Sequence, residues 1–544
     1  MQSQFSFTGN IVDVISERIF KGTIIIEKGK IISLKEGKAD TNQYIIPGLI
    51  DAHIHIESSM LVPSEFARLA VVHGTVATVS DPHEIANVLG IKGVDFMIGN
   101  GKKVPFKFYF GAPSCVPATP FESAGATLGV EDTDNLLQRN EIKYLSEMMN
   151  FPGVLNENKE VAAKLDAARK YNKPVDGHAP GLTDEDLKKY IHAGITTDHE
   201  CFTIEEALEK IKYGMKIQIR EGSAAKNFDA LIPLLKLHPD KIMLCSDDKH
   251  PDDLVEGHIN LLVKRAIHLG YDPVKVLKAC TYNPAKHYQL DVGLLQVGDP
   301  ADFSIVNNLN DFSILATYIN GELVAQRGKS FLKPVIITTP NKFCADLIDK
   351  KDLEVKARGN YMKVIRALEG QLITEKVIVK VKSENGFIQN DPEKDILKIV
   401  VLNRYSKSKP SIGFINGFGL KKGAIASTVA HDSHNIIAVG SNDEEIVQAI
   451  NLLIESKGGI SLIDGDKILH LPLPVAGIMS NENGYKVAKN YKLLNGEVKN
   501  LGSALQSPFM TLSFMALLVI PELKMSDRGL FDGKKFEFTS LFAD

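Results

Sequence analysis

The chain has 544 residues, of which 44% are hydrophobic and 24% are charged, and its formal net charge is −4 at pH 7. This length exceeds one ordinary domain and indicates two or three, and the composition is typical of a folded globular protein. A near-neutral charge without a strongly basic block argues against nucleic acid as a partner.

The N-terminal residues, the longest apolar run and the cysteines indicate where in the cell we expect the protein. Residues Met1–Phe5 carry no basic segment and no apolar stretch follows them, so we expect no signal peptide. The longest apolar run, Phe509–Ile520, is too short to span a bilayer, so we expect a buried segment there and no membrane partner. Five scattered cysteines without a CxxC pair favour a reducing compartment, and we therefore expect a cytoplasmic protein.

Two distant segments have the pattern of a small β-sheet. Residues 1–46 contain short β-branched runs separated by Gly, Lys and Asn, which predict a meander. Residues 290–333 contain a turn, a strand and a hairpin with Asn320-Gly321 at its tip. We expect both segments to form one composite β-sandwich domain that flanks the rest of the chain.

Residues 47–289 alternate between short apolar strands and helical stretches. Eight repeats over about 240 residues match the count and length of a (β/α)8 TIM barrel, in which the site lies at the C-terminal ends of the strands. A doubly wound open sheet is the structural alternative, and it would gather polar residues near one switch point. The expected strands are Ile46–His55, Val76–Asp81, Lys107–Ala112, Lys143–Met148, Pro174–His178, Ile195–His199, Lys216–Arg220 and Lys241–Ser246. The expected helices include Pro63–His73, Lys159–Tyr171, Asp184–His192, Ile204–Tyr213 and Phe228–Leu237.

Residues 334–544 predict a third domain of the α+β class. Apolar runs at 377–381, 397–402 and 435–440 indicate strands, and residues 444–456 indicate a helix. Between two of these strands lies the segment His431-Asp-Ser-His-Asn435. A polar turn explains it, because loops favour Asp, Ser and Asn. A functional role is the alternative, since this part of the sequence has few other histidines.

Nearly every expected barrel strand is followed by a residue of a metal-ligand or acid–base type. Scattered surface polarity would not follow the strand ends in this way, so we expect these residues to gather at one end of the barrel. They are His53, His55, Asp81, His83, Glu84, Glu147, His178, Asp198, His199, Glu200, Arg220, Glu221, Asp247 and Asp248.

His53 and His55 are the first pair of candidate metal ligands. Residues two apart on a strand project to the same face. The neighbours Leu49, Ile50 and Ile54 predict a buried strand, where two unpartnered imidazoles would be costly. Two surface histidines on an edge strand are the alternative interpretation.

The other candidate ligands complete a set of four imidazoles and two carboxylates. That is enough for two metal ions joined by one bridging carboxylate, which would activate a shared water. The mixed nitrogen and oxygen donors leave Zn, Mn and Fe all open. The set consists of His53, His55, His178, His199, Glu147 and Asp247.

The segments Pro47–His55 and Gly293–Asp302 resemble the amidohydrolase superfamily. Longer contiguous motifs are similar to its adenine deaminase family, and this resemblance covers essentially the whole chain. These motifs are His53–Met60, Ser80–Val88, Ser146–Val154, Asp176–Leu182, Thr197–Glu200, Ser246–Asp253, Pro508–Phe514 and Pro521–Lys524.

The resemblance implies a site with two divalent ions, Mn²⁺ or Fe²⁺, and the hydrolysis of adenine to hypoxanthine and ammonia in purine salvage. It implies that His53, His55 and Asp247 bind one ion, that His178 and His199 bind the other, and that Glu147 bridges them. Many superfamily members use a carbamylated lysine on the fourth strand, where this chain has Glu147 and places Lys143 at the opposite end. A homo-oligomer, taken as a dimer, is the expected assembly.

Further roles follow from the proposed reaction. Asp247 would accept the proton of the attacking water and pass it to the departing amine. Glu200 is the candidate acid toward the purine ring, and His83 with Glu84 is expected to hold the purine edge; helix-start carboxylates are the alternative for Glu84 and Glu200. His431 and His434 are expected to close over the site or position the base.

Two other functions stay open from the sequence. One is hydrolysis of a different cyclic amide or amidine, such as guanine, a hydantoin or a dihydropyrimidine. The other is a non-catalytic assembly protein with the amidohydrolase fold, which the complete set of six ligands disfavours.

Overall fold

The computed structural model describes residues 4–543. By its contacts the chain divides into two units. The first holds the residues up to His83, Asp95–Cys115 and Gly129–Ile336, and the second holds Glu84–Val94, Val116–Leu128 and the residues from Ile337 onward. Two segments that follow barrel strands in the sequence are therefore grouped with the second unit. The three-domain division stays a prediction.

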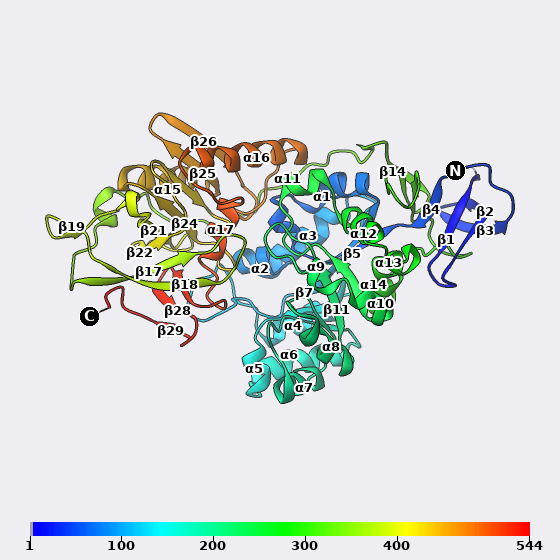
Figure 1. The fold of residues 1–544 in the computed structure, drawn as a ribbon, viewed down its shortest axis with the longest axis horizontal. Helices are drawn as coiled ribbons and strands as arrows, with labels where there is room; N and C mark the ends of the chain where they lie inside the picture. The colour runs from blue at the N-terminus through cyan, green and yellow to red at the C-terminus, as the bar shows by residue number, and fades with distance from the viewer. Residues whose placement is uncertain (1–3, 544) are drawn as a thin grey trace. The chain divides into compact units, whose positions relative to one another are not determined.

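The first unit contains a ring of parallel strands with helices around it (Figure 1). Five strands pair in the order β5 to β9 and three in the order β10 to β12. Isolated bridges from Val175 to Ile195 and from Ile54 to Asp247 join the two groups. The predicted TIM-type barrel is thus confirmed. Its strands are β5 (Leu49–Ile54), β6 (Thr75–Ser80), β7 (Lys107–Ala112), β8 (Ile142–Met148), β9 (Val175–Gly177), β10 (Thr197–Asp198), β11 (Lys216–Arg220) and β12 (Ile242–Cys245).

Helices cover the outside of the ring, and two of the expected helices are divided. Residues 63–73 form α1 (Pro63–Ala70) followed by a 3-10 helix, Val71–His73. The expected helix Phe228–Leu237 consists of two short helices, α9 (Phe228–Leu231) and α10 (Leu234–Leu237), separated by Ile232 and Pro233. The proline lacks the N–H that a continuous helix would need there. The other helices include α6 (Lys159–Lys170), α7 (Asp184–His192), α8 (Ile204–Lys212), α12 (Ile259–His268), α13 (Pro273–Ala279) and α14 (Tyr282–His287).

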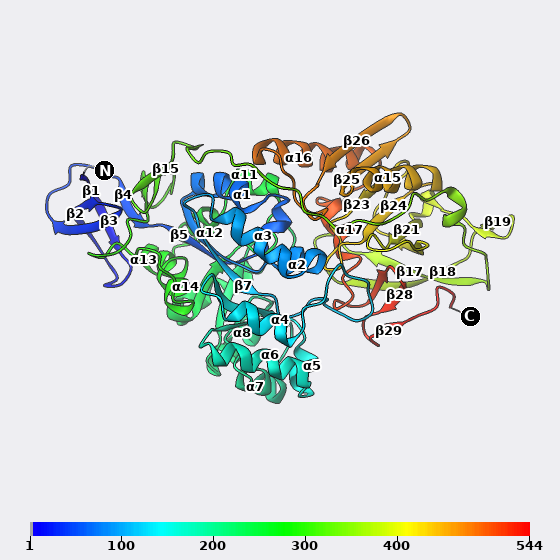
Figure 2. The ribbon, with the colours of Figure 1, turned by 180° about the vertical axis from the view of Figure 1, so that it is seen from behind.

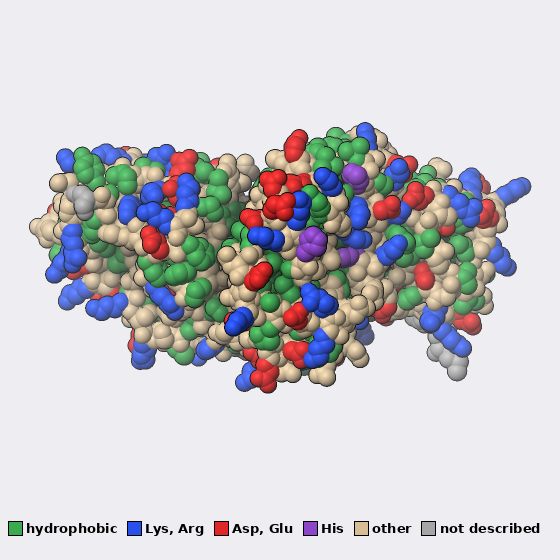
Figure 3. Space-filling view, turned by 90° about the horizontal axis from the view of Figure 1, so that it is seen from below, with side chains coloured by type: hydrophobic (Ala, Val, Ile, Leu, Met, Phe, Trp, Pro, Cys, Tyr) green, Lys and Arg blue, Asp and Glu red, His purple; other side chains and the backbone are tan. Residues whose placement is uncertain are grey.

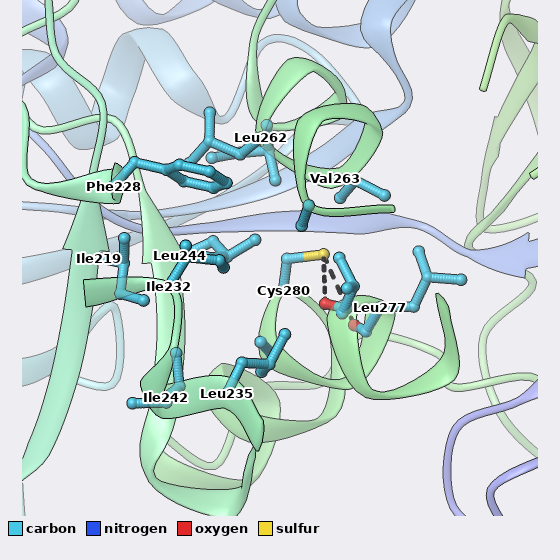
Figure 4. Close-up of a cluster of buried hydrophobic side chains, with 14 of the residues drawn as sticks. Ile219, Phe228, Ile232, Leu235, Ile242, Leu244, Leu262, Val263, Leu277 and Cys280 are labelled. Atoms are coloured by element: carbon cyan, nitrogen blue, oxygen red, sulfur yellow. Dashed lines mark hydrogen bonds between the residues drawn. The ribbon is translucent and has the colours of Figure 1, made fainter. Parts of the chain in front are cut away.

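A buried apolar cluster fixes strands β11 and β12 against these helices (Figure 4). Side chains from the two strands face side chains from α9, α10, α12 and α13, and the Cys280 thiol donates to the Leu277 carbonyl oxygen. Packing of this kind holds the strand ends that carry the polar residues. The labelled members are Ile219, Phe228, Ile232, Leu235, Ile242, Leu244, Leu262, Val263, Leu277 and Cys280.

The two β-rich segments predicted at the flanks share one sheet. Strand β13 (Phe303–Val306) pairs with β4 (Tyr44–Pro47), which also pairs with β1 (Phe5–Asp13). Figure 1 shows the blue N-terminal strands near the green strand β14, and Figure 2 shows them from behind, near the green strand β15. The hairpin turn at Asn320-Gly321 has positive φ at both residues, as a two-residue turn of this type requires. The sheet also contains β2 (Arg18–Glu27), β3 (Lys30–Glu36), β14 (Ile314–Ile319), β15 (Glu322–Gln326) and β16 (Lys329–Ser330).

The second unit is built on a mixed sheet of eight strands covered by helix α15 (Asp443–Ser456). The apolar run predicted as a buried segment begins within helix α17 (Pro508–Phe514). The sheet order is β18 (Thr374–Lys380), β17 (Tyr361–Ala367), β22 (Ser411–Asn416), β21 (Leu397–Leu402), β24 (Ile436–Gly440), β23 (Ala424–Ser427), β25 (Gly459–Asp464) and β26 (Lys467–Pro472).

The surface carries both signs of charge. Figure 3 shows Lys and Arg side chains interspersed with Asp and Glu side chains on the face in view. Among residues 4–543, no helix combines the length and the apolar character that a membrane crossing requires.

The core packing yields a stability prediction. Leu244 on β12 is 0% exposed, and its truncation in Leu244→Ala leaves a cavity among the residues of Figure 4. We expect a loss of about 2–5 kcal/mol in the free energy of unfolding of the first unit. Urea unfolding followed by circular dichroism measures it. Leu237→Ala is the matched control, because Leu237 is 61% exposed, and an equal effect of both substitutions would contradict the assigned core.

Candidate metal and catalytic site

The barrel brings four predicted ligands together on the side of strand β5. His53 lies on β5 and His55 directly after its end, and their side chains are almost fully buried. His55 Nε2 lies 3.4 Å from Asp247 Oδ1 and 3.4 Å from Glu147 Oε1. His53 Nε2 lies 3.8 Å from Asp247 Oδ1. These distances place two imidazoles and two carboxylates around one point.

The remaining ligands meet the opposite oxygen of Glu147. His178 Nδ1 lies 2.9 Å from Glu147 Oε2, and His199 Nε2 lies 3.2 Å from the same oxygen. Since Oε1 faces His55, the two oxygens of one carboxylate face two groups of histidines. This is the geometry that a bridging carboxylate needs. All six residues predicted as ligands therefore converge in the first unit.

The buried donor atoms of these residues are better suited to bind metal ions than to form hydrogen bonds with one another. Both ring nitrogens of His53, and Nδ1 of His199, are buried without a hydrogen-bond partner in the part of the chain that the structure describes. An uncompensated buried polar atom is costly, and a metal ion would satisfy it. Two triads have their ligand atoms within 4.8 Å of one another: His53, His55 and Asp247, and His53, Glu147 and His199. Imidazole and carboxylate donors suit Mn, Fe and Zn.

Arg220 neutralises two carboxylates beside these ligands. Its Nη1 lies 2.5 Å from Asp247 Oδ2 and 2.5 Å from Glu200 Oε1, and its Nη2 lies 2.8 Å from Glu200 Oε2. Burial acts to raise the pKa of Glu200, but Arg220 and then His178 outweigh it and hold the pKa well below its ordinary value. Arg220 and His55 likewise lower the pKa of Asp247 against the effect of burial. Both carboxylates are therefore ionised.

His83 lies next to the ligands, as expected for a residue near the substrate. Its Nδ1 is 3.0 Å from Asp81 Oδ2 and 3.6 Å from Glu147 Oε1, and its ring centroid is 4.6 Å from that of His55. His83 is thus part of the same cluster in the first unit. Its predicted contact with substrate stays a prediction.

Glu84, His431 and His434 come together in the second unit. Glu84 Oε1 lies 2.6 Å from His431 Nδ1, and Glu84 Oε2 bonds His434 Nε2. All three side chains are buried, and His431 stacks on Phe514 with ring centroids 4.7 Å apart. Burial lowers the pKa of His434 to about 4, so this imidazole is neutral at pH 7. The sequence predicted a role for each residue but not their mutual contact.

Several buried residues near the ligands were missed by the sequence reasoning. Arg220 was noted only as a polar strand end, and Asp51 and His258 received no role. Asp51 Oδ2 lies 2.8 Å from His258 Nε2, although 207 residues separate them. The only sequence signal was the place of Asp51, two residues before His53 in an apolar strand, where an acidic side chain requires a buried partner.

Two regions of the chain match known families. Residues 44–324 match the amidohydrolase family, and residues 371–537 match the adenine deaminase C-terminal domain. The first match spans the barrel and the strands that return to the N-terminal sheet. The second spans most of the second unit's sheet.

Curated relatives match along the full chain. The adenine deaminase of Methanosarcina mazei is 55% identical over 551 residues, covering 99% of both chains. That of Salinibacter ruber is 51% identical and covers 100% of both. That of Borreliella burgdorferi is 50% identical, covering 98% of this chain and 99% of its own.

The neutral state of His434 yields a pH prediction. Its folded pKa of about 4 lies below the ordinary 6.5, so the unfolded chain binds this proton more readily. Below pH 6.5 the unfolding free energy should therefore fall as pH falls, by up to about 1.4 kcal/mol per pH unit, until pH reaches about 4. His434→Asn should flatten this slope in urea unfolding between pH 4 and 7. His192→Asn is the control, because His192 is exposed; equal slopes in all three proteins would contradict the assignment.

Proposed function

The chain belongs to the adenine deaminase family of the amidohydrolases, and on that premise we propose that it hydrolyses adenine to hypoxanthine and ammonia. The observation that carries the proposal is the bridging position of Glu147 between two histidine groups at the barrel's strand ends. A site of this kind activates water for attack on an electrophilic carbon. Loss of the exocyclic amine then completes the exchange of nitrogen for oxygen at C6 of the purine.

The proposed cofactors are two divalent ions, Mn²⁺ or Fe²⁺, with Zn²⁺ also compatible with the donors. His53, His55 and Asp247 would hold one ion, His178 and His199 would hold the other, and Glu147 would contact both. When bound, such a pair supplies an activated water and polarises the carbon that water attacks. The unpartnered nitrogens of His53 support this assignment.

Asp247 is the proposed proton carrier. Its ionised carboxylate, beside His55 and Arg220, is in the state that accepts a proton from the attacking water. It then returns that proton to the departing amino group, so the carboxylate is regenerated and ammonia leaves. Arg220 restrains Oδ2 of this carboxylate through an ion pair, which orients Oδ1 toward the histidines.

Glu200 is the proposed acid toward a ring nitrogen of the purine. Its ion pair with Arg220 opposes this role, because a carboxylate held ionised has no proton to donate. Glu200→Gln distinguishes a proton-donating role from an electrostatic one. If Glu200 donates the proton, turnover should fall strongly at every pH. If its role is electrostatic, turnover should change but remain substantial.

The remaining assignments are proposed from the sequence. His83, Glu84, His431 and His434 are assigned to substrate binding. The contacts of His83 with Asp81 and Glu147 support its part in this assignment. A homodimer in the cytoplasm is the proposed state of the protein, on the resemblance and on the scattered cysteines respectively.

The proton-carrier role predicts the behaviour of Asp247→Asn. The amide keeps the shape and one oxygen donor but cannot carry the proton, so we expect metal content near normal and turnover lower by roughly 10²- to 10⁴-fold. Metal analysis and ammonia release measure the two quantities. Asp229→Asn is the control, because the Asp229 side chain is 77% exposed. Near-wild-type turnover in Asp247→Asn would reject the role.

The reaction itself is tested by ammonia release from adenine, with protein reconstituted with Mn²⁺ or, without oxygen, with Fe²⁺. We expect metal-dependent conversion to hypoxanthine, seen as a change in ultraviolet absorbance that matches the ammonia formed. Guanine and a dihydropyrimidine are the comparison substrates. Two bound metal ions without ammonia from adenine would retain the site and reject this substrate.

A further inference from the structure

Strand β12 leads into a residue with an unusual backbone conformation. Asp247 has a φ of 56°, in the left-handed region that residues with a side chain seldom adopt. Such a conformation persists only where the surrounding structure holds it. Asp247 directs its carboxylate at the histidines of β5, so the groups that hold its backbone also decide where its oxygens lie.

Asp51 is placed to hold this turn. Its carboxylate is 0% exposed, and Oδ1 accepts the N–H of Ser246 at 3.0 Å while Oδ2 accepts the Ser246 hydroxyl. Ser246 directly precedes Asp247, whose own N–H donates to the His53 carbonyl oxygen at 2.9 Å. These bonds tie the two peptides that precede the left-handed residue to strand β5. On its other side the Asp247 carbonyl oxygen accepts the His55 N–H at 3.3 Å.

His258 in turn fixes Asp51. Its Nε2 lies 2.8 Å from Asp51 Oδ2, and its Nδ1 lies 2.8 Å from the Thr75 hydroxyl. The ring is 1% exposed and packs edge-on against Phe66 at 5.7 Å between centroids. Because both nitrogens have partners, the ring has one orientation, and one nitrogen always faces the carboxylate.

We propose that Asp51 and His258 are positioning residues for Asp247. His258, at the start of helix α12, orients the Asp51 carboxylate, which holds Ser246 and with it the left-handed turn. Hydrogen bonds connect Thr75, His258, Asp51 and Ser246 in series. Through them, the positions of β6 and α12 determine where the Asp247 carboxylate lies relative to His53 and His55. This inference rests on the proposed function and adds residues that contact neither substrate nor metal. Partners of this kind typically change metal affinity or activity by about 10- to 100-fold.

Two substitutions of His258 separate hydrogen bonding from packing. The amide N–H of His258→Gln occupies the place of Nε2–H and keeps the bond to Asp51. His258→Leu fills similar space without a donor. The matched control is His268→Leu at the other end of the same helix, where the exposed His268 ring has Nε2 at 2.9 Å from the Asn310 carbonyl oxygen.

The experiment compares metal release to a chelator with kcat and KM for adenine in Mn²⁺-loaded full-length protein. We expect His258→Leu to release metal faster or turn over more slowly by about 10- to 100-fold, with KM within about twofold of wild type. His258→Gln should recover most of the loss, and His268→Leu should match wild type.

Three results would overturn the proposal. Wild-type metal release and kcat in His258→Leu would remove the positioning role, and equal impairment of the Gln and Leu variants would assign the effect to packing. Ser246→Ala provides a milder test if His258→Leu does not fold, because it removes only the hydroxyl bond to Asp51; wild-type values there would also overturn the proposal. Metal release needs no substrate, so this test stands even if adenine is not turned over.

Discussion

The first and last strands of the barrel meet at Ile54 and Asp247, and the hydrogen bonds there also build the site. The bridge between Ile54 and Asp247 joins β12 to β5, with the Asp247 N–H donating to the His53 carbonyl and the His55 N–H facing the Asp247 carbonyl at 3.3 Å. The same few residues carry two imidazoles and one carboxylate. A shift of one residue in the register between β12 and β5 would turn these side chains to the other face of the strand. The hydrogen bonds that close the barrel therefore also fix the spacing of the candidate ligands.

Burial of so many carboxylates requires positive charge close by. Burial acts to raise the pKa of Glu147, but His178 and His199 outweigh it and keep the carboxylate ionised. Arg220 does the same for Glu200 and Asp247. Unpaired buried charges of this kind would be prohibitive, whereas paired ones are tolerated. Arg220 lies beside Glu200 and Asp247. Within residues 4–543, both ring nitrogens of His53 and Nδ1 of His199 lack a hydrogen-bond partner, and the proposed metal ions would bind among these histidines.

The parts of the fold set by local pattern were predictable from the sequence. Strand β7 begins and ends at Lys107 and Ala112 as expected, and all six candidate ligands converge because parallel strands deliver their ends to one edge. The expected helix Phe228–Leu237 is interrupted because Pro233 overrides the apolar period. Pairings between distant residues left no local signal: Asp51 and His258 each look like an isolated polar residue, and only the fold brings them together.

For Glu84 the structure shows contacts that differ from those the sequence suggested. The sequence associated Glu84 with its neighbour His83 and treated His431 and His434 as a separate cluster. In the structure His83 contacts Asp81 and Glu147, whereas both oxygens of Glu84 are bound by the two later histidines. The chain passes from the first unit to the second between these two consecutive residues. One peptide bond therefore links a histidine beside the ligands to a carboxylate that two distant histidines bind.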